Sequence, residues 1–179
     1  MKLVILDRDG VINVDSADYI KTPEEWHPIP GSIDAIAHLH QAGYTIAIAT
    51  NQAGIARQLY DHAMLARIHQ KMLEQIQAAG GHIELIVYCP HHPDEQCACR
   101  KPAPGLLHQI EERLGVSVKD APFVGDSLKD LQAGTALSCQ PVLVKTGHGQ
   151  ETLSQLKTQP DINARAYEDL AAFVEDFLA

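Results

Sequence analysis

The sequence predicts an α/β fold built on a parallel, doubly wound sheet with helices on both faces. Short, continuously apolar runs alternate along the chain with amphipathic stretches of helical length, which is typical of strands buried on both faces. The 179 residues and the 45% hydrophobic content are those of an ordinary globular domain. We therefore expect residues 1–179 to form one domain.

The apolar runs predict the strands, and the stretches between them predict the helices. Strands are expected at residues 3–6, 44–50, 83–89, 121–125 and 141–147. Helices are expected at residues 31–43, 61–81, 105–114, 126–137 and 167–178. Gly43 ends the first helix, and Asp61 is the expected N-cap of the second. Residues 148–166 have no clear pattern beyond a short helix near 150–157.

Charge and composition exclude several classes of protein. The 14 basic and 23 acidic residues give a net charge of −9, which disfavours a binder of nucleic acids or anionic membranes because both would be repelled. No apolar run approaches the roughly 18 residues that span a bilayer, and the N-terminus lacks the pattern of a targeting segment. Three of the four cysteines cluster, which favours a metal site in a reducing compartment. We expect a cytoplasmic monomer.

Polar and acidic residues follow three of the predicted strands directly. Asp7-Arg8-Asp9 follows the first strand, Thr50-Asn51-Gln52 the second, and Gly125-Asp126-Ser127 the fourth. Any one of these segments alone would be an ordinary turn. In a doubly wound sheet, however, ligands bind beyond the carboxyl ends of the strands, so the three segments together predict a functional site at that edge.

Asp7 and Asp9 stand two positions apart in an extended segment and so point to the same side. Together with Asp126 they would repel one another unless a hard divalent cation such as Mg²⁺ were bound. The roles of two acids remain open. Asp126 could instead cap the following helix, a task that Ser127 could also perform. Asp130 could complete a capping box or support the metal ligands.

Two further side chains would complete a phosphoryl-transfer site. Thr50 offers a hydroxyl group, although "TNQAG" could also be a simple turn. Lys101 lies between prolines in "CRKPAPG", and a cation held in so stiff a loop could neutralise phosphate oxygens. A carboxylate nucleophile, a magnesium ion, a hydroxyl group and a lysine are the groups that such chemistry requires.

The four segments "DRDG", "TNQ", "RKP" and "GDSLKD" resemble, in this order, the motifs of the haloacid dehalogenase-like phosphatases. The resemblance implies that Asp7 is the nucleophile and forms an aspartyl-phosphate, while Asp9 is the general acid and base. It further implies that Asp7, the backbone carbonyl of Asp9 and Asp126 hold Mg²⁺, and that Thr50 and Lys101 bind the phosphoryl group. The chain has little room for the separate cap domain of larger members.

A second metal site is predicted in the loop over residues 89–104. The segment "CPHHPDEQCAC" places Cys89, His91, Cys97 and Cys99 within eleven residues, a ligand set that suits a closed tetrahedral Zn²⁺ site. Such a zinc ion would be structural and would aim Arg100 and Lys101 at the cavity. His92 is an alternative ligand that spacing does not exclude.

A zinc loop of this kind resembles a subgroup of the family that includes heptose bisphosphate 7-phosphatases and histidinol-phosphate phosphatases. "LDRDGVINVD", "TNQAGIAR" and "YCPHHP" are more similar to the heptose enzymes, which implies a place in lipopolysaccharide precursor synthesis and a sugar bisphosphate as partner. The substrate contacts that the resemblance implies are Asp15, Ser16, Asp18, Tyr19, Asn51, Gln52, Ala53, Arg100, Lys101 and Ser127.

Three alternatives to a heptose phosphatase follow from the same residues. The short loop between His91 and Cys97 resembles the histidinol type, and Ser127 stands where many heptose enzymes have lysine. A phospho-acceptor receiver domain also combines Asp, Thr and Lys, but it needs neither a second acid two positions on nor a zinc loop. A zinc-binding nucleic-acid module, including a DNA-end phosphatase, is disfavoured by the net charge and by the nine aromatic residues.

Overall fold

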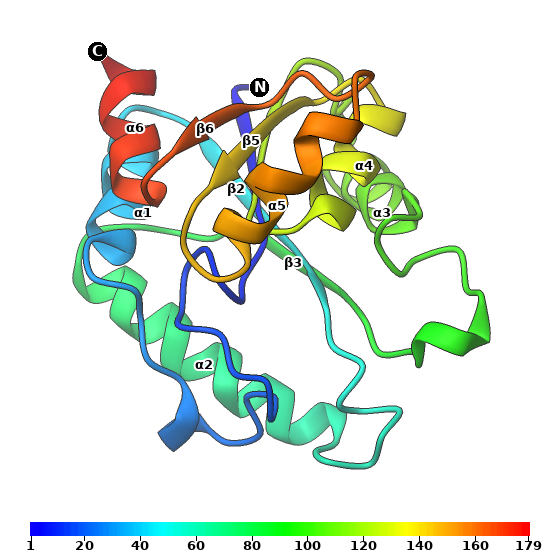
Figure 1. The fold of residues 1–179 in the computed structure, drawn as a ribbon. Helices are drawn as coiled ribbons and strands as arrows, with labels where there is room; N and C mark the ends of the chain where they lie inside the picture. Colours follow the sequence, from blue (N-terminus) through cyan, green and yellow to red (C-terminus); the bar gives the residue numbers. More distant parts are fainter.

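The computed structural model describes all residues, 1–179, and contains one sheet of six parallel strands (Figure 1). The strands are β1 (Leu3–Leu6), β2 (Thr45–Asn51), β3 (Leu85–Cys89), β4 (Pro122–Gly125), β5 (Gln140–Val144) and β6 (Arg165–Tyr167). Their order across the sheet is β3-β2-β1-β4-β5-β6. This is the order of a doubly wound fold, and it confirms the predicted fold class.

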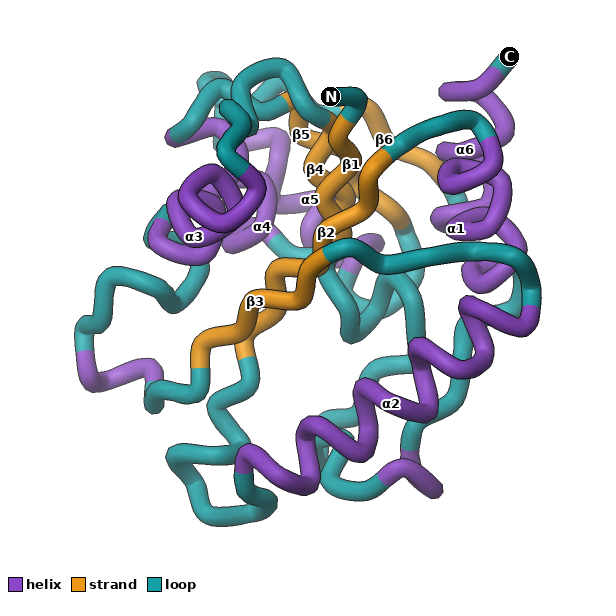
Figure 2. The backbone as a smooth tube through the Cα atoms, turned by 180° about the vertical axis from the view of Figure 1, so that it is seen from behind, coloured by secondary structure: helices purple, strands orange, loops and turns teal.

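Helices cover both faces of the sheet, as Figure 2 shows from behind. The six α-helices are α1 (Ser32–Gln41), α2 (His62–Ala78), α3 (Gly105–Leu114), α4 (Leu128–Ala136), α5 (Gly149–Gln155) and α6 (Leu170–Leu178). Helices α1, α2 and α6 pack on one face, and α3 and α4 pack on the other. No helix of the structure combines the length and the hydropathy that crossing a bilayer would need.

The alternation of side chains along β1 explains why its sequence is apolar throughout. Val4 and Leu6 belong to the core of 21 buried residues beneath α1, α2 and α6. Leu3 and Ile5 point the other way, into the core of 14 buried residues beneath α3 and α4. A strand at the centre of a sheet covered on both faces has no side that can be polar.

The structure differs from the sequence prediction at the C-terminal end. Residues 165–167 form β6, an edge strand paired with Val142–Val144, and the sequence analysis did not predict it. The last helix begins at Leu170 rather than at residue 167, because the side chain of Asp169 accepts a hydrogen bond of 2.8 Å from Ala172 N–H and caps it. The short helix expected near 150–157 is present as α5.

The strand order places the candidate site at a defined point. Strand β1 lies between β2 and β4 at the centre of the sheet, where the winding of the chain changes direction. Asp7 continues directly from β1, and its N–H donates a hydrogen bond of 2.9 Å to the carbonyl of Val124 in β4. The segments after β1, β2 and β4 therefore meet at one edge of the sheet, as the sequence predicted.

Candidate active site

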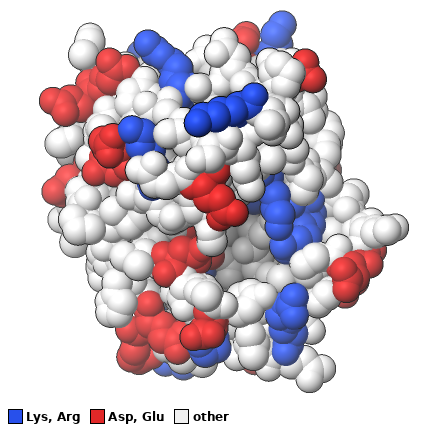
Figure 3. Space-filling view, viewed as in Figure 1, with Lys and Arg blue, Asp and Glu red and all other residues white.

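A cavity of about 740 Å³ opens at the carboxyl edge of the sheet. Figure 3 shows the hollow, with cationic atoms along one side and acidic atoms along the other. The predicted site residues that line it are Asp7, Asp9, Asp15, Ser16, Tyr19, Thr50, Asn51, Gln52, Arg100, Lys101, Asp126 and Ser127. The structure places the other two predicted residues outside it: Asp18 is exposed, and Ala53 is buried.

Lys101 is the central cation of the site, although its side chain is almost completely buried. Its Nζ lies 3.0 Å from Asp7 Oδ1, 2.6 Å from Asp130 Oδ1 and 2.8 Å from the carbonyl oxygen of Ala49. Burial lowers the pKa of Lys101, but the charges of Asp130 and Asp7 outweigh it, so that the net pKa is raised. Lys101 therefore stays charged and holds one oxygen of Asp7 in place.

The first turn of α4 settles the two alternatives for Asp126 and Asp130. Ser127 is the N-cap residue of α4, and Asp130 Oδ2 accepts hydrogen bonds from its N–H (3.1 Å) and its hydroxyl (3.0 Å). Asp130 is thus the capping-box acid and, through its other oxygen, a partner of Lys101. Asp126 does not cap the helix, and its Oδ2 accepts a hydrogen bond of 2.9 Å from His148 N–H.

Three carboxylates lie close enough together to hold a divalent cation. One oxygen each from Asp7, Asp126 and Asp130 lies within 4.8 Å of the others. Burial and then the charge of Asp130 raise the pKa of Asp7 well above its usual value, and the same two causes raise the pKa of Asp126 to about 7. A hard cation such as Mg²⁺ bound between Asp7 and Asp126 would favour the ionised forms of both.

The backbone at two glycines packs directly against the carboxylate of Asp126. Gly10 and Gly147 both have positive φ angles (82° and 56°), and a Cβ atom at either position would overlap the carboxylate of Asp126. The carbonyl oxygen of Asp9 accepts no hydrogen bond from the chain. It is therefore free to bind a metal ion, as the family resemblance implies.

The carboxylate of Asp9 has different surroundings from those of Asp7. Its oxygens accept hydrogen bonds from Arg8, from Asn13 Nδ2 (2.9 Å) and from Gln52 Nε2 (3.1 Å). Burial raises the pKa of Asp9, but Arg8 and these donors outweigh it and lower the net pKa. Gln52 Nε2 also lies 3.0 Å from the hydroxyl of Thr50, which connects the ends of β1 and β2.

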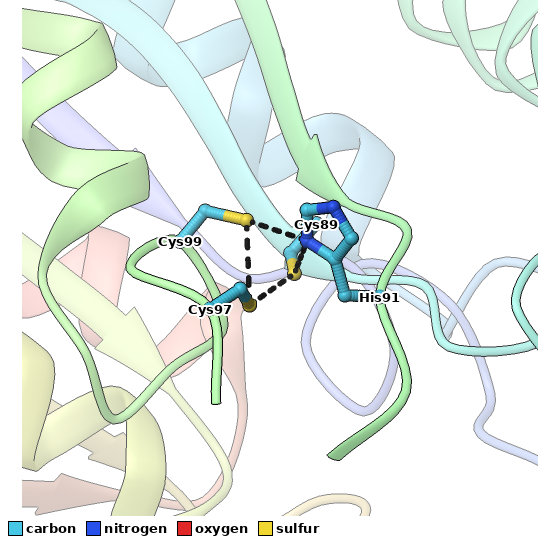
Figure 4. Close-up of side chains that lie close together, drawn as sticks. All are labelled: Cys89, His91, Cys97 and Cys99. Atoms are coloured by element: carbon cyan, nitrogen blue, oxygen red, sulfur yellow. Dashed lines mark hydrogen bonds between the residues drawn. The ribbon is translucent and has the colours of Figure 1, made fainter. Parts of the chain in front are cut away.

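The predicted zinc ligands lie together at the end of β3 and in the loop that follows it (Figure 4). Four contacts join them: Cys89 Sγ to His91 Nδ1 (3.4 Å) and to Cys97 Sγ (3.6 Å), and Cys99 Sγ to His91 Nδ1 (3.2 Å) and to Cys97 Sγ (3.7 Å). Ligands about 2.3 Å from a tetrahedral zinc ion stand about 3.8 Å apart, so these spacings suit Zn²⁺. The alternative ligand His92 instead caps the turn at Pro93–Glu95.

Two contacts connect this loop to the cavity. The N–H of Arg100 donates to Cys97 Sγ at 3.3 Å. The side chain of Asn51 holds the backbone of Lys101 from both sides, because its Nδ2 donates to the carbonyl (3.1 Å) and its Oδ1 accepts from the N–H (3.0 Å). The position of Lys101 therefore depends on both β2 and the cysteine cluster.

Several residues that line the cavity were not found from the sequence: Lys129, Gln132, His148, Glu151 and Gln155. Lys129 and Gln132 lie on α4, and the other three lie at α5 or just before it. His148 Nε2 lies 3.0 Å from Asp15 Oδ2, so this region contacts the segment after β1. Lys129 is part of the segment "GDSLKD". Its position on the first turn of the helix was the only feature of the sequence that could have indicated that it lines the cavity.

Comparison with known proteins places the chain in a family. The model of the haloacid dehalogenase-like hydrolases matches residues 5–137, which is more than half of the chain. The chain belongs to this family. The matched residues include all four segments on which the resemblance rested, "DRDG", "TNQ", "RKP" and "GDSLKD".

Individual relatives match over nearly their whole length. The D-glycero-β-D-manno-heptose-1,7-bisphosphate 7-phosphatases of Pseudomonas aeruginosa and Pseudomonas putida are 56% and 53% identical, with 98% and 99% of this chain and 97% and 100% of theirs covered. A crystal structure of the D,D-heptose 1,7-bisphosphate phosphatase of B. bronchiseptica, complexed with magnesium and phosphate, has a TM-score of 0.94 at 49% identity and covers 99% of this chain and 98% of that one. These matches confirm that the chain is a phosphatase of this fold.

The raised pKa of Asp126 predicts how stability depends on pH and magnesium. Because the pKa rises from 3.8 to about 7 on folding, the metal-free protein loses stability as the pH increases through that interval. Mg²⁺ must displace a proton below this pKa and not above it. We expect a fixed Mg²⁺ concentration to raise the Tm more at about pH 8 than at about pH 6, as measured by calorimetry.

The matched control is Asp126→Asn, which keeps the shape of the side chain and removes its charge. Its Tm should respond little to Mg²⁺ at either pH. An equal Mg²⁺ response of the unsubstituted protein at both pH values would contradict the role of Asp126.

Proposed function

We propose that this chain is an Mg²⁺-dependent phosphatase that removes the 7-phosphate of D-glycero-β-D-manno-heptose 1,7-bisphosphate. The relatives that match nearly the whole chain support the substrate. The observation that carries the reaction is the carboxylate of Asp7, which lies at the base of the cavity with one oxygen held 3.0 Å from Lys101 Nζ. Lys101 thereby orients Asp7 as a nucleophile and offsets part of the repulsion between Asp7 and the neighbouring carboxylates.

The reaction has two steps on this chain. In the first, an oxygen of Asp7 attacks phosphorus, the bond from phosphorus to the sugar oxygen breaks, and Asp9 gives a proton to that oxygen. Because the pKa of Asp9 is lowered in the free chain, Asp9 takes up this proton when the negatively charged substrate binds beside it. In the second, Asp9 takes a proton from water as the water oxygen attacks phosphorus and the bond to Asp7 breaks. The balance is one ester and one water consumed, and one alcohol and one phosphate released.

The residues around the phosphoryl group have separate tasks. Lys101 and the hydroxyl of Thr50, both at the cavity wall, bind the equatorial oxygens. Asp7 and Asp126, together with the unpaired carbonyl of Asp9, are the groups that would hold Mg²⁺. When bound, Mg²⁺ neutralises charge on the transferring phosphoryl group.

The distal phosphate of the substrate needs a cation away from Lys101, and two are present. Arg100 and Lys129 both line the cavity, and a buried Nη1 of Arg100 has no hydrogen-bond partner within the chain. The pKa of Lys129 is lowered by partial loss of hydration and then by the charge of Arg100, so the two cations lie close enough to repel. An anion bound between them would satisfy both.

The same pair argues against histidinol phosphate as the substrate. That molecule carries an amine and an imidazole where the heptose has its second phosphate, and Arg100 and Lys129 would repel the amine. Lys129 also offers a cation near the position where Ser127 replaces the lysine of many heptose enzymes. Tyr19, Asp15 and Ser16 also line the cavity and would contact the sugar.

The cysteine cluster is proposed to bind one structural Zn²⁺. Burial raises the pKa of Cys97, but the N–H of Arg100 and the neighbouring thiols outweigh it and lower the net pKa to about 7, which makes a thiolate accessible for metal binding. Four protein ligands would leave no open position for catalysis. Because the site needs reduced thiols, we place the enzyme in the cytoplasm, where residues 1–179 act as one domain.

Asp7→Asn is expected to abolish turnover while leaving the fold intact. A carboxamide is a far weaker nucleophile and a weaker metal ligand than a carboxylate. The measurement is kcat on heptose bisphosphate together with the Tm, and Asp34→Asn on the exposed face of α1 is the control. More than a few per cent of the unsubstituted rate in a folded Asp7→Asn protein would refute the assignment of the nucleophile.

Arg100→Ala is expected to lower kcat/KM for the bisphosphate about 10- to 100-fold, since a charge-assisted contact to phosphate contributes roughly 1.5–3 kcal/mol. Lys129→Gln should act in the same direction, and both should affect a small monophosphate less. Arg67→Ala, an exposed arginine of α2, is the control. Equal losses on both substrates would assign Arg100 to the transferring phosphate, and faster hydrolysis of histidinol phosphate by the unsubstituted enzyme would overturn the proposed substrate.

His91→Ala and Cys97→Ser are expected to lose zinc, whereas His92→Ala and Cys139→Ser should keep one zinc ion per chain, because the latter two residues lie outside the cluster. Loss of zinc should also lower the Tm and the activity, since metal binding is coupled to ordering of the loop. Elemental analysis of protein purified without chelator provides the measurement. Absence of zinc from that unsubstituted protein would contradict the proposed site.

A further inference from the structure

Arg8 stands between the two aspartates of the site, and its side chain is completely buried. Its Nε and Nη2 both donate hydrogen bonds to the same atom, Asp9 Oδ1, at 2.9 and 2.8 Å. A guanidinium removed from water must have such partners, because an unpaired buried charge is strongly destabilising. Arg8 is therefore tied to the orientation of Asp9.

The other end of the guanidinium is also held. Its Nη1 lies 3.2 Å from Nε2 of His69, a buried residue of α2. Burial, and then the charge of Arg8, lower the pKa of His69 to about 3. The imidazole is therefore neutral and can accept the hydrogen bond from Arg8, which anchors the guanidinium to a helix of the core.

These contacts make the two oxygens of Asp9 unequal. Oδ1 accepts the two hydrogen bonds from Arg8 and a third from Asn13 Nδ2 at 2.9 Å. Oδ2 accepts only one from within the chain, from Gln52 Nε2 at 3.1 Å. A carboxylate oxygen has about two lone-pair sites, so Oδ1 is saturated while Oδ2 has capacity left.

We propose that Arg8, anchored by His69, is a positioning residue that occupies Oδ1 of Asp9 and leaves Oδ2 as the atom that exchanges the proton. The proton on Oδ2 passes to the sugar oxygen as its bond to phosphorus breaks, and Oδ2 recovers a proton from the attacking water in the second step. This inference rests on the role of Asp9 in the proposed function. It does not depend on which phosphate ester is the substrate.

The test measures kcat/KM for a series of aryl phosphates of graded leaving-group acidity, together with heptose bisphosphate. An acidic phenol leaves without help from a general acid, whereas a sugar alcohol needs it. We expect Arg8→Gln to lower kcat/KM about 100-fold for heptose bisphosphate and less than about tenfold for the most acidic phenol. The dependence of log kcat/KM on leaving-group pKa should therefore become steeper, as in Asp9→Asn.

A double variant separates positioning from general damage. In the Asp9→Asn background, Arg8→Gln should cost little further activity, because two residues that act through one group are not additive. Equal losses across the aryl series, or full additivity in the double variant, would overturn the proposal. Failure of the unsubstituted enzyme on heptose bisphosphate alone would overturn the proposed substrate instead, while the aryl series would still test Arg8.

A pair of His69 variants tests the same proposal if Arg8→Gln does not fold. His69→Gln keeps an oxygen that can accept from Arg8, whereas His69→Leu removes the acceptor at similar size. We expect the steeper leaving-group dependence in His69→Leu and nearly unsubstituted behaviour in His69→Gln. The same dependence in both folded variants as in the unsubstituted enzyme would contradict the anchoring role of His69.

Discussion

The ammonium group of Lys101 lies where the ends of β1, β2 and α4 meet, and it has almost no contact with water. It contacts Asp7, Asp130 and the carbonyl of Ala49 at the same time. Its charge counteracts part of the burial and of the repulsion from other carboxylates that together raise the pKa of Asp7, and so favours the ionised form that acts as the nucleophile. Two sets of hydrogen bonds keep Lys101 in that place. The side chain of Asn51 binds the backbone of Lys101, and the N–H of the preceding residue, Arg100, binds Cys97 of the cysteine cluster.

Most of the fold could be predicted because strands β1 to β5 are largely apolar and the helices between them are amphipathic. Strand β6 was missed for a physical reason. It has three residues, two of them exposed, at the edge of the sheet, so its hydrogen bonds to β5 are not accompanied by an apolar pattern. The start of α6 was predicted too early because Tyr167 contributes to the apolar pattern, although it belongs to β6.

Site residues could be predicted where reactive side chains lie at the ends of strands and where metal ligands are close together in the sequence. Asp7 and Asp126 directly follow strands, Thr50 lies at the end of one, and the four residues of the cysteine cluster lie within eleven positions of one another. Lys129 and His148 reach the cavity from a helix and a loop whose placement depends on packing. The sequence alone assigns no role to Arg8, since only its depth of burial and its contact with α2 distinguish it from a surface arginine.

The segment after β5 forms one wall of the site, although none of the four family motifs lies in it. Thr146 Oγ1 donates a hydrogen bond of 2.6 Å to the carbonyl of Gly10, Gly147 lies against Asp126, and His148 N–H binds that carboxylate. The family match ends at residue 137, before all three. The smallest catalytically complete piece of this chain is therefore longer than its recognisable core, and a truncation designed from the motifs alone would remove one wall of the cavity.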